Sequence, residues 1–140
     1  MNDKRILEVK NLEFSFDIYS GEVQAVRDVT FHVDKGETLG IVGESGCGKS
    51  VTVQTIMKLT PMPPGRVKGG RIIFENEDIT DYDSRQMEKI RGAKTGMIFQ
   101  DPMTSLNPTM TVGRQMTEGL IKHLRMSRKQ AMKKRSNCLI

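Results

Sequence analysis

The sequence TLGIVGESGCGKSVTVQTIMKL, residues 38–59, combines three local patterns in direct succession. Residues 38–42 form a short, continuous, β-prone run, which is typical of a buried parallel strand. A glycine-rich segment follows, and the stretch after Lys49 has apolar residues at helical spacing, ended by prolines at 61, 63 and 64. The pattern therefore predicts a strand, a glycine-rich loop and a helix, whose apolar positions are Val53, Ile56, Met57 and Leu59.

The glycine-rich segment at 43–50 matches the pattern G-x-x-x-x-G-K-[ST]. Glycines let the backbone curl so that successive N–H groups point inward at a polyphosphate, and the following helix adds the positive end of its dipole. We expect Lys49 to reach the β- and γ-phosphates and Ser50 to complete a Mg²⁺ shell. The alternative is a turn that only links the strand to the helix. The residues of this predicted phosphate loop are Gly43, Glu44, Ser45, Gly46, Cys47, Gly48, Lys49 and Ser50.

Two segments before this region predict antiparallel strands. Residues 6–16 and 23–33 alternate between apolar and polar side chains, and turn signals stand at 20–21 and 34–37. Such segments form an antiparallel sheet with one face exposed to solvent. The side chains expected to share a face are Leu12, Phe14 and Phe16 in the first segment, and Val29, Phe31 and Val33 in the second.

Further elements are predicted after the glycine-rich loop. Residues 70–74 and 96–99 have the apolar character of strands, the second one buried. Asp83 and Ser84 are suited to cap a short helix that runs to Ile90. Thr111 is suited to cap a longer helix, and Ser127 to start a very basic one. The apolar stripe of the longer helix, spaced four apart, is Val112, Met116, Leu120 and Leu124.

Composition excludes several classes of protein. The 140 residues suit one domain, and 36% of them are hydrophobic. The apolar runs are far shorter than the roughly 20 residues that cross a bilayer, and residues 1–10 lack the apolar core of a secretory leader. Two cysteines without metal-ligand spacing argue against a disulfide scaffold.

The net charge of +5 is unevenly distributed. No acidic residue follows Glu118, so the basic excess belongs to the C-terminal segment. One interpretation is a solvated helix face, and the other is a surface that binds nucleic acid or anionic lipid. No aromatic residue lies among these charges to stack on bases, and we expect no nucleic-acid partner. The basic residues are Lys122, Arg125, Arg128, Lys129, Lys133, Lys134 and Arg135.

The motifs of one other class of phosphate-binding protein, the GTPases, are missing. Neither D-x-x-G nor N-K-x-D follows the loop, which argues against a GTPase. Small kinases with a phosphate loop are harder to exclude by motif, and they stay an alternative. The residues before the loop are enough for a β-subdomain, whereas many small kinases begin near their phosphate loop.

Three segments together resemble the ATP-binding subunits of ATP-binding-cassette transporters, in particular the oligopeptide, dipeptide and nickel importer branch. The segments are LEVKNLEFSF at 7–16, the stretch from Gly21 through Thr52, and GMIFQDPMTSLNP at 96–108. The resemblance implies an α/β fold: a P-loop NTPase core with an N-terminal antiparallel β-subdomain and the start of a helical subdomain. The implied parts are 1–37 (β-subdomain), 38–100 (phosphate-loop core) and 101–140 (Q-loop and helical subdomain).

The resemblance also assigns roles to individual residues. Phe16 takes the place of the aromatic ring that stacks on adenine, with a plain core position as the alternative. Val51 joins the phosphate loop as a nucleotide-binding residue. Gln100 takes the place of the Q-loop glutamine, which touches Mg²⁺ or the attacking water and links the site to the membrane partner; the alternative is a glutamine that satisfies loop backbone. Lys49 and Gln100 are thus the expected catalytic residues, and Ser50 and Gln100 the expected Mg²⁺ ligands, whereas Asp101 is not placed among the ligands.

Other landmarks of the family do not occur. There is no L-S-G-G-Q signature and no apolar run ending in Asp-Glu, and neither His32 nor His123 stands where the switch histidine belongs. We therefore expect a truncated cassette, as from truncation or a frameshift, that binds ATP without hydrolysing it alone.

In the family, the whole subunit uses ATP hydrolysis to drive import of peptides or nickel. It works with permease subunits and a second ATP-binding subunit, peripherally at the cytoplasmic face of the cell membrane. The alternatives are a non-catalytic nucleotide-binding fragment and a basic-tail binder of nucleic acid or a membrane surface.

Overall fold

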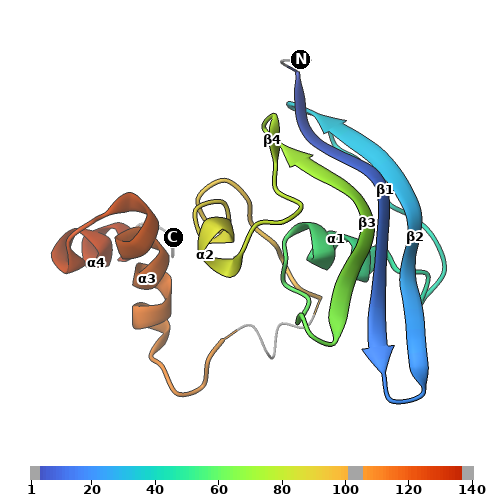
Figure 1. Ribbon diagram of the computed structural model, residues 1–140. Coiled ribbons are helices and arrows are strands. Elements are labelled where there is room, and N and C mark those ends of the chain that lie inside the picture. The colour runs from blue at the N-terminus through green and yellow to red at the C-terminus, as the bar shows by residue number, and fades with distance from the viewer. Residues whose placement is uncertain (1–3, 101–105, 137–140) are drawn as a thin grey trace. The chain divides into compact units, whose positions relative to one another are not determined.

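The computed structural model describes residues 4–100 and 106–136, with the side chains of the last two of these left aside (Figure 1). The chain divides into two compact units, Met1–Met87 and Glu88–Ile140. No helix in the described ranges is both long and apolar enough to cross a bilayer.

The first unit is built on an antiparallel sheet. Its strands are β1 (Arg5–Ile18), β2 (Gly21–Asp34), β3 (Gly65–Phe74) and β4 (Glu77–Asp78), in the spatial order β2-β1-β3-β4. β1 pairs with β2 on one side and with β3 on the other. The two alternating segments thus form the predicted antiparallel strands, and β3 begins five residues before the predicted 70–74.

The apolar face of β1 forms the core of this sheet. Leu12 and Phe14 are fully buried, and Phe14 packs edge-to-face on the half-buried Phe16 with ring centroids 5.1 Å apart. Ile72 of β3 and Val26 of β2 are buried with them. The predicted shared face of β1 is confirmed, because alternate residues of a strand point to the same side.

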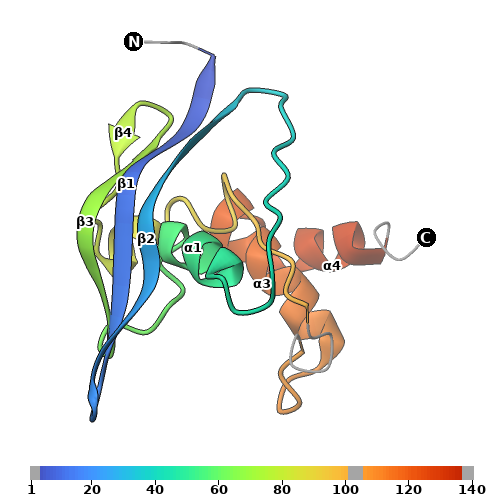
Figure 2. The same ribbon diagram turned by 90° about the vertical axis from the view of Figure 1, so that its right-hand side faces the viewer.

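Helix α1 (Lys49–Ile56) lies against one face of the sheet (Figure 2). It ends three residues before the predicted Leu59, because Lys58 adopts a left-handed backbone with φ 50°. The Lys58 ammonium donates to the carbonyl oxygens of Thr80 at 2.5 Å and Tyr82 at 2.8 Å. Burial lowers the pKa of Lys58, against the opposing effect of Asp81 and Asp83. These bonds tie the end of α1 to the segment after β4.

Two predicted strands are wrong. Residues 38–42 and 96–99, each within its own unit, pair with no strand among the described residues. Val42 is 93% exposed and Ile98 is 98% exposed. An apolar run predicts burial, but a parallel strand also needs a neighbouring strand for its backbone hydrogen bonds, and the run does not specify one.

Helix α2 (Ser84–Met87) begins with the predicted cap. The Gln86 N–H donates to the Asp83 carboxylate at 2.7 Å, and the Asp83 N–H donates to the Gln86 side-chain oxygen at 2.8 Å. This reciprocal pair is a capping box. The helix ends at Met87, and the remaining predicted residues to Ile90 form a turn.

The second unit contains α3 (Val112–Leu124) and α4 (Arg128–Ser136). Thr111 precedes α3 as predicted, but its side chain makes no capping hydrogen bond. The predicted apolar stripe of α3 is not buried, since Val112 is 52% and Leu124 54% exposed. The buried position is Thr117, whose hydroxyl donates to carbonyl oxygens one turn earlier.

Ser127 caps α4 in full, which gives a testable contrast with Thr111. Ser127 exchanges hydrogen bonds with Gln130, including its N–H to the Gln130 side-chain oxygen at 2.9 Å. We expect Ser127→Ala to destabilise α4 by about 1 kcal/mol, seen as faster amide exchange in its first turn. Thr111→Ala is the matched control and should leave α3 nearly unchanged. Equal effects of the two changes would contradict the assignment of the caps.

Candidate functional site

The predicted phosphate loop, residues 43–50, follows a segment without regular secondary structure and runs into the start of α1. Gly48 is the N-cap residue of α1, with a left-handed backbone at φ 90° and ψ 0°. A Cβ atom at Gly48 would lie 2.4 Å from the carbonyl oxygen of Ala25 on β2. Only glycine therefore fits at this position, where loop, helix and sheet meet.

The Lys49 side chain folds back over this loop. Its ammonium donates to the carbonyl oxygens of Gly43 at 2.7 Å and Glu44 at 2.6 Å, and lies 3.4 Å from the sulfur of Cys47. The loop is also closed by its own backbone, since the Cys47 N–H donates to the Glu44 carbonyl oxygen at 3.4 Å. A full positive charge is thus placed inside the curl of the loop.

The start of α1 supplies further donors beside that charge. Ser50 and Val51 are the next two residues of the helix, and Ser50 is exposed. The backbone N–H groups of a first helical turn have no acceptor within the helix, so they are available to an anion. The first hydrogen bond of the helix runs from the Thr52 N–H to the Gly48 carbonyl oxygen at 2.8 Å. The groups gathered here are donors and a cation, which suit a polyphosphate.

A cavity of about 300 Å³ adjoins the loop on the side of β2. Its lining was not anticipated from the sequence, because the alternating segment 23–33 carries no chemistry-bearing pattern of its own. The resemblance covered this segment without assigning it a role. The cavity is lined by Gln24, Ala25, Val26, Arg27 and Val29 of β2 and by Gly46, Cys47 and Thr52.

Two predicted site residues, Phe16 and Gln100, lie outside the loop. Phe16 contacts Phe14 and is not part of the cavity lining. Gln100 is exposed and belongs to the second unit, outside helices and strands. Their roles toward adenine and Mg²⁺ stay predictions. Asp101 lies outside the described residues.

The side chains available as ligands decide how a metal ion could be held at this site. In the part of the chain that the structure describes, no three His, Cys, Asp or Glu side chains are grouped to hold a metal ion. The Ser50 hydroxyl is a fitting oxygen ligand, but most of the oxygen ligands of a Mg²⁺ ion here would come from phosphate and water. The residues present thus fit Mg²⁺ as the companion of a bound nucleotide.

A glycine-rich loop that enters a helix N-terminus, crossed by a lysine ammonium, defines a phosphate-loop nucleotide-binding protein. Residues 26–138 match the family model described as "ABC transporter". The chain belongs to this family, as the three quoted segments indicated.

Curated relatives agree with the importer branch. The chain is 63% identical over 132 residues to the oligopeptide transport ATP-binding protein OppD of Bacillus subtilis, covering 94% of this chain and 37% of OppD. It is 55% identical over 130 residues to the dipeptide transport ATP-binding protein DppD of the same organism, covering 93% of this chain and 39% of DppD. The chain therefore spans somewhat more than a third of the length of these relatives.

Solved structures confirm the fold class. The dimeric structure of MJ0796, a bacterial ABC transporter cassette, superposes with a TM-score of 0.80 at 27% identity, covering 96% of this chain and 56% of that chain. A post-hydrolysis state of the same cassette, bound to ADP and Pi, gives the same TM-score, identity and coverage. The structure of cbiO1 from Clostridium perfringens matches with a TM-score of 0.68 at 26% identity, covering 97% of this chain and 49% of that chain.

Proposed function

We propose that this chain is the ATP-binding part of the ATP-binding subunit of a peptide importer. The observation that carries the proposal is the Lys49 ammonium held within the loop, 2.7 and 2.6 Å from two of its carbonyl oxygens. A phosphate oxygen carries a negative charge that these neutral carbonyl oxygens lack, so it is the stronger partner for the ammonium. The printed names of OppD and DppD support peptides as the cargo.

Each site residue then has a role toward MgATP. The backbone of residues 43–48 and the first turn of α1 hold the phosphates, and Lys49 neutralises the β- and γ-phosphates. Ser50 holds the Mg²⁺ ion together with phosphate oxygens, and Gln100 adds a ligand or orients water. Phe16 stacks on adenine, and the cavity beside β2 takes up neighbouring parts of the nucleotide. The bound ATP supplies a phosphoanhydride bond whose hydrolysis drives transport in the complete subunit.

The assembly around this chain is part of the proposal. We expect permease subunits and a second ATP-binding subunit as partners, at the cytoplasmic face of the membrane. The dimeric structure of the cassette MJ0796 supports the pairing of two cassettes. The present sequence holds neither a signature motif nor a catalytic glutamate after an apolar run, so we expect it to bind ATP without turnover.

Calorimetry with nucleotides tests the binding role. MgATP and MgADP should release heat on binding, whereas MgAMP should bind at least about tenfold more weakly, because a single phosphate cannot reach all the donors of the loop. Phosphate release should stay at the level of buffer. Equal affinity for MgAMP, or no heat from material with intact secondary structure, would refute the proposal. Robust turnover would refute the expectation that this chain is not hydrolytic alone.

A further inference from the structure

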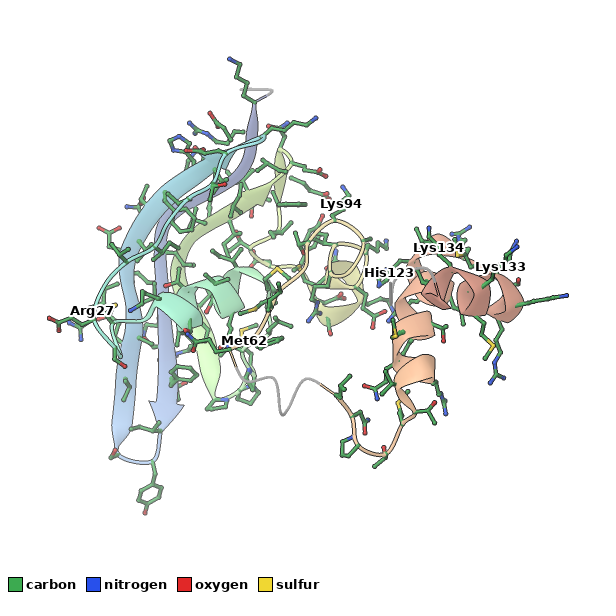
Figure 3. All side chains as sticks on the ribbon, turned by 180° about the vertical axis from the view of Figure 1, so that it is seen from behind. Arg27, Met62, Lys94, His123, Lys133 and Lys134 are labelled. Atoms are coloured by element: carbon green, nitrogen blue, oxygen red, sulfur yellow. The ribbon has the colours of Figure 1, made fainter. Side chains whose placement is uncertain are left out.

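The second unit carries a cationic surface that the nucleotide site does not use. We define this basic surface as Arg125, Arg128, Lys129, Lys133 and Lys134, all of which are exposed. Figure 3 labels the last two of these on α4. The sequence has no Asp or Glu after Glu118, so no acidic residue is interleaved with these charges along the chain. Lys122 is left out of the set, because it pairs with Glu88 at 3.3 Å.

The burial of one alanine fixes the orientation of α4. Ala131 is fully buried, so its side of α4 faces the body of the unit. At 3.6 residues per turn, Lys129 and Lys133 lie on the opposite side, one turn apart. They therefore form the outermost charged pair of the basic surface.

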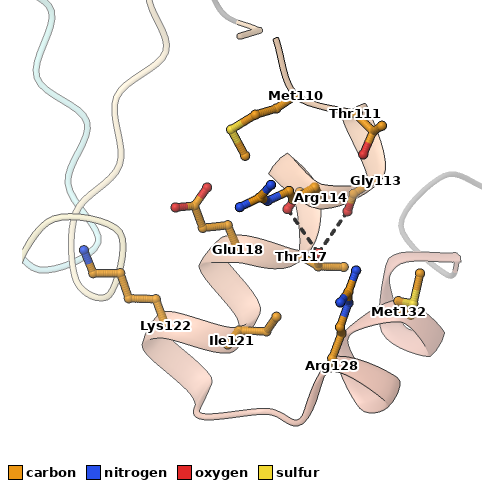
Figure 4. A pocket seen from close by; sticks show the side chains of 10 residues that line it. All are labelled: Met110, Thr111, Gly113, Arg114, Thr117, Glu118, Ile121, Lys122, Arg128 and Met132. Atoms are coloured by element: carbon orange, nitrogen blue, oxygen red, sulfur yellow. Dashed lines mark hydrogen bonds between the residues drawn. The ribbon is translucent and has the colours of Figure 1, made fainter. Parts of the chain in front are cut away.

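Apolar side chains lie among these cations. Leu124 is 54% exposed and Met132 is 46% exposed. Arg128 and Met132 also line a cavity of about 660 Å³ between α3 and α4, together with Ile121 and Met110 (Figure 4). An exposed leucine beside Lys and Arg is found in elements that rest at a lipid–water boundary.

The same composition disfavours nucleic acid. Proteins that bind single strands stack bases on aromatic rings. No aromatic residue follows Phe99 in this sequence. The charges alone attract any polyanion, but the exposed apolar side chains gain nothing from a sugar–phosphate backbone, whereas they lose water contact at a bilayer surface.

We propose that the basic surface binds the anionic phospholipid face of a membrane bilayer. Each Lys or Arg near such a surface contributes about 1 kcal/mol, which is about a fivefold change in the partition constant. The interaction acts over the Debye length and weakens with salt. It places the second unit against lipid independently of the phosphate loop in the first unit.

Vesicle sedimentation of the purified 140-residue chain tests the proposal. The chain should co-sediment with vesicles of phosphatidylcholine that contain about one third phosphatidylglycerol. It should not co-sediment with vesicles of phosphatidylcholine alone. Raising the salt concentration should release the chain. Equal binding to the neutral vesicles, or binding that salt does not weaken, would overturn the proposal.

Matched charge reversals locate the surface. Lys129→Glu with Lys133→Glu should lower the partition constant by at least about twentyfold, because two attractive charges become repulsive. Lys4→Glu with Lys35→Glu changes the net charge equally on exposed residues of the first unit and should have a much smaller effect. Lys129→Gln with Lys133→Gln is the milder pair, and circular dichroism of each variant checks that helix content is retained. Equal losses in the two charge-reversed pairs would overturn the proposal.

Two further arms separate this inference from other functions. Lys49→Ala should bind anionic vesicles as strongly as the parent chain does. Vesicle binding therefore tests the lipid proposal even if the proposed nucleotide binding fails. A DNA duplex at the same phosphate concentration should bind more weakly than the anionic vesicles. Tighter binding to the duplex would overturn the lipid assignment in favour of nucleic acid.

Discussion

Lys49→Ala is expected to raise the dissociation constant for MgATP at least about a hundredfold. The ammonium of Lys49 is the positive side-chain charge placed within the loop, as its contacts to Gly43 and Glu44 show. Hydrogen bonds to charged groups contribute about 1.5–3 kcal/mol each, and at least two phosphate contacts are lost. Titration calorimetry of the two proteins under the same conditions measures the difference.

The control for this change is Lys35→Ala. Lys35 lies exposed in the turn after β2, so its loss changes the net charge equally without touching the loop. It should leave the dissociation constant within about twofold of the parent, because exposed charges at a distance are screened. A comparable loss in both variants would mean that overall charge, and not the placement of Lys49, holds the nucleotide. Unchanged binding in Lys49→Ala would remove the basis of the proposed function.

The elements that the sequence predicts well are those specified by neighbours along the chain. The strands β1 and β2 follow from alternation, and the starts of α2 and α4 follow from capping residues such as Asp83 and Ser127. The loop at 43–50 is equally predictable, because its glycines, its lysine and the helix that follows it are contiguous in the sequence. Short-range chemistry decides all of these features, so a single sequence is sufficient to predict them.

The features that the sequence predicts poorly depend on partners far away along the chain. Residues 38–42 and 96–99 are as apolar as buried strands, yet pairing is a property of two segments and not of one. The early end of α1 lies at Lys58, whose left-handed backbone ends the helix and whose ammonium reaches across to Thr80 and Tyr82. The same holds at the site, where the contact between Gly48 and Ala25 joins residues that no motif connects.

That contact predicts a large effect for Gly48→Ala. The new methyl group would lie 2.4 Å from the Ala25 carbonyl oxygen, and the backbone at φ 90° is already unfavourable for a side chain. The left-handed backbone costs about 1–2 kcal/mol and a forced fit in a packed site about 1–3 kcal/mol, so we expect a loss of about 3 kcal/mol in unfolding free energy. Urea unfolding followed by circular dichroism measures it.

Gly46→Ala isolates the steric part of that loss. Gly46 has a similar backbone at φ 81°, but a Cβ atom there meets nothing within 4 Å. The variant should therefore lose only the conformational part, about 1–2 kcal/mol. If the clash is relieved by movement of β2 away from the start of α1, then Gly48→Ala should also weaken MgATP binding more than Gly46→Ala does. Equal losses in both variants would show that backbone conformation alone requires these glycines, and that β2 does not support the loop.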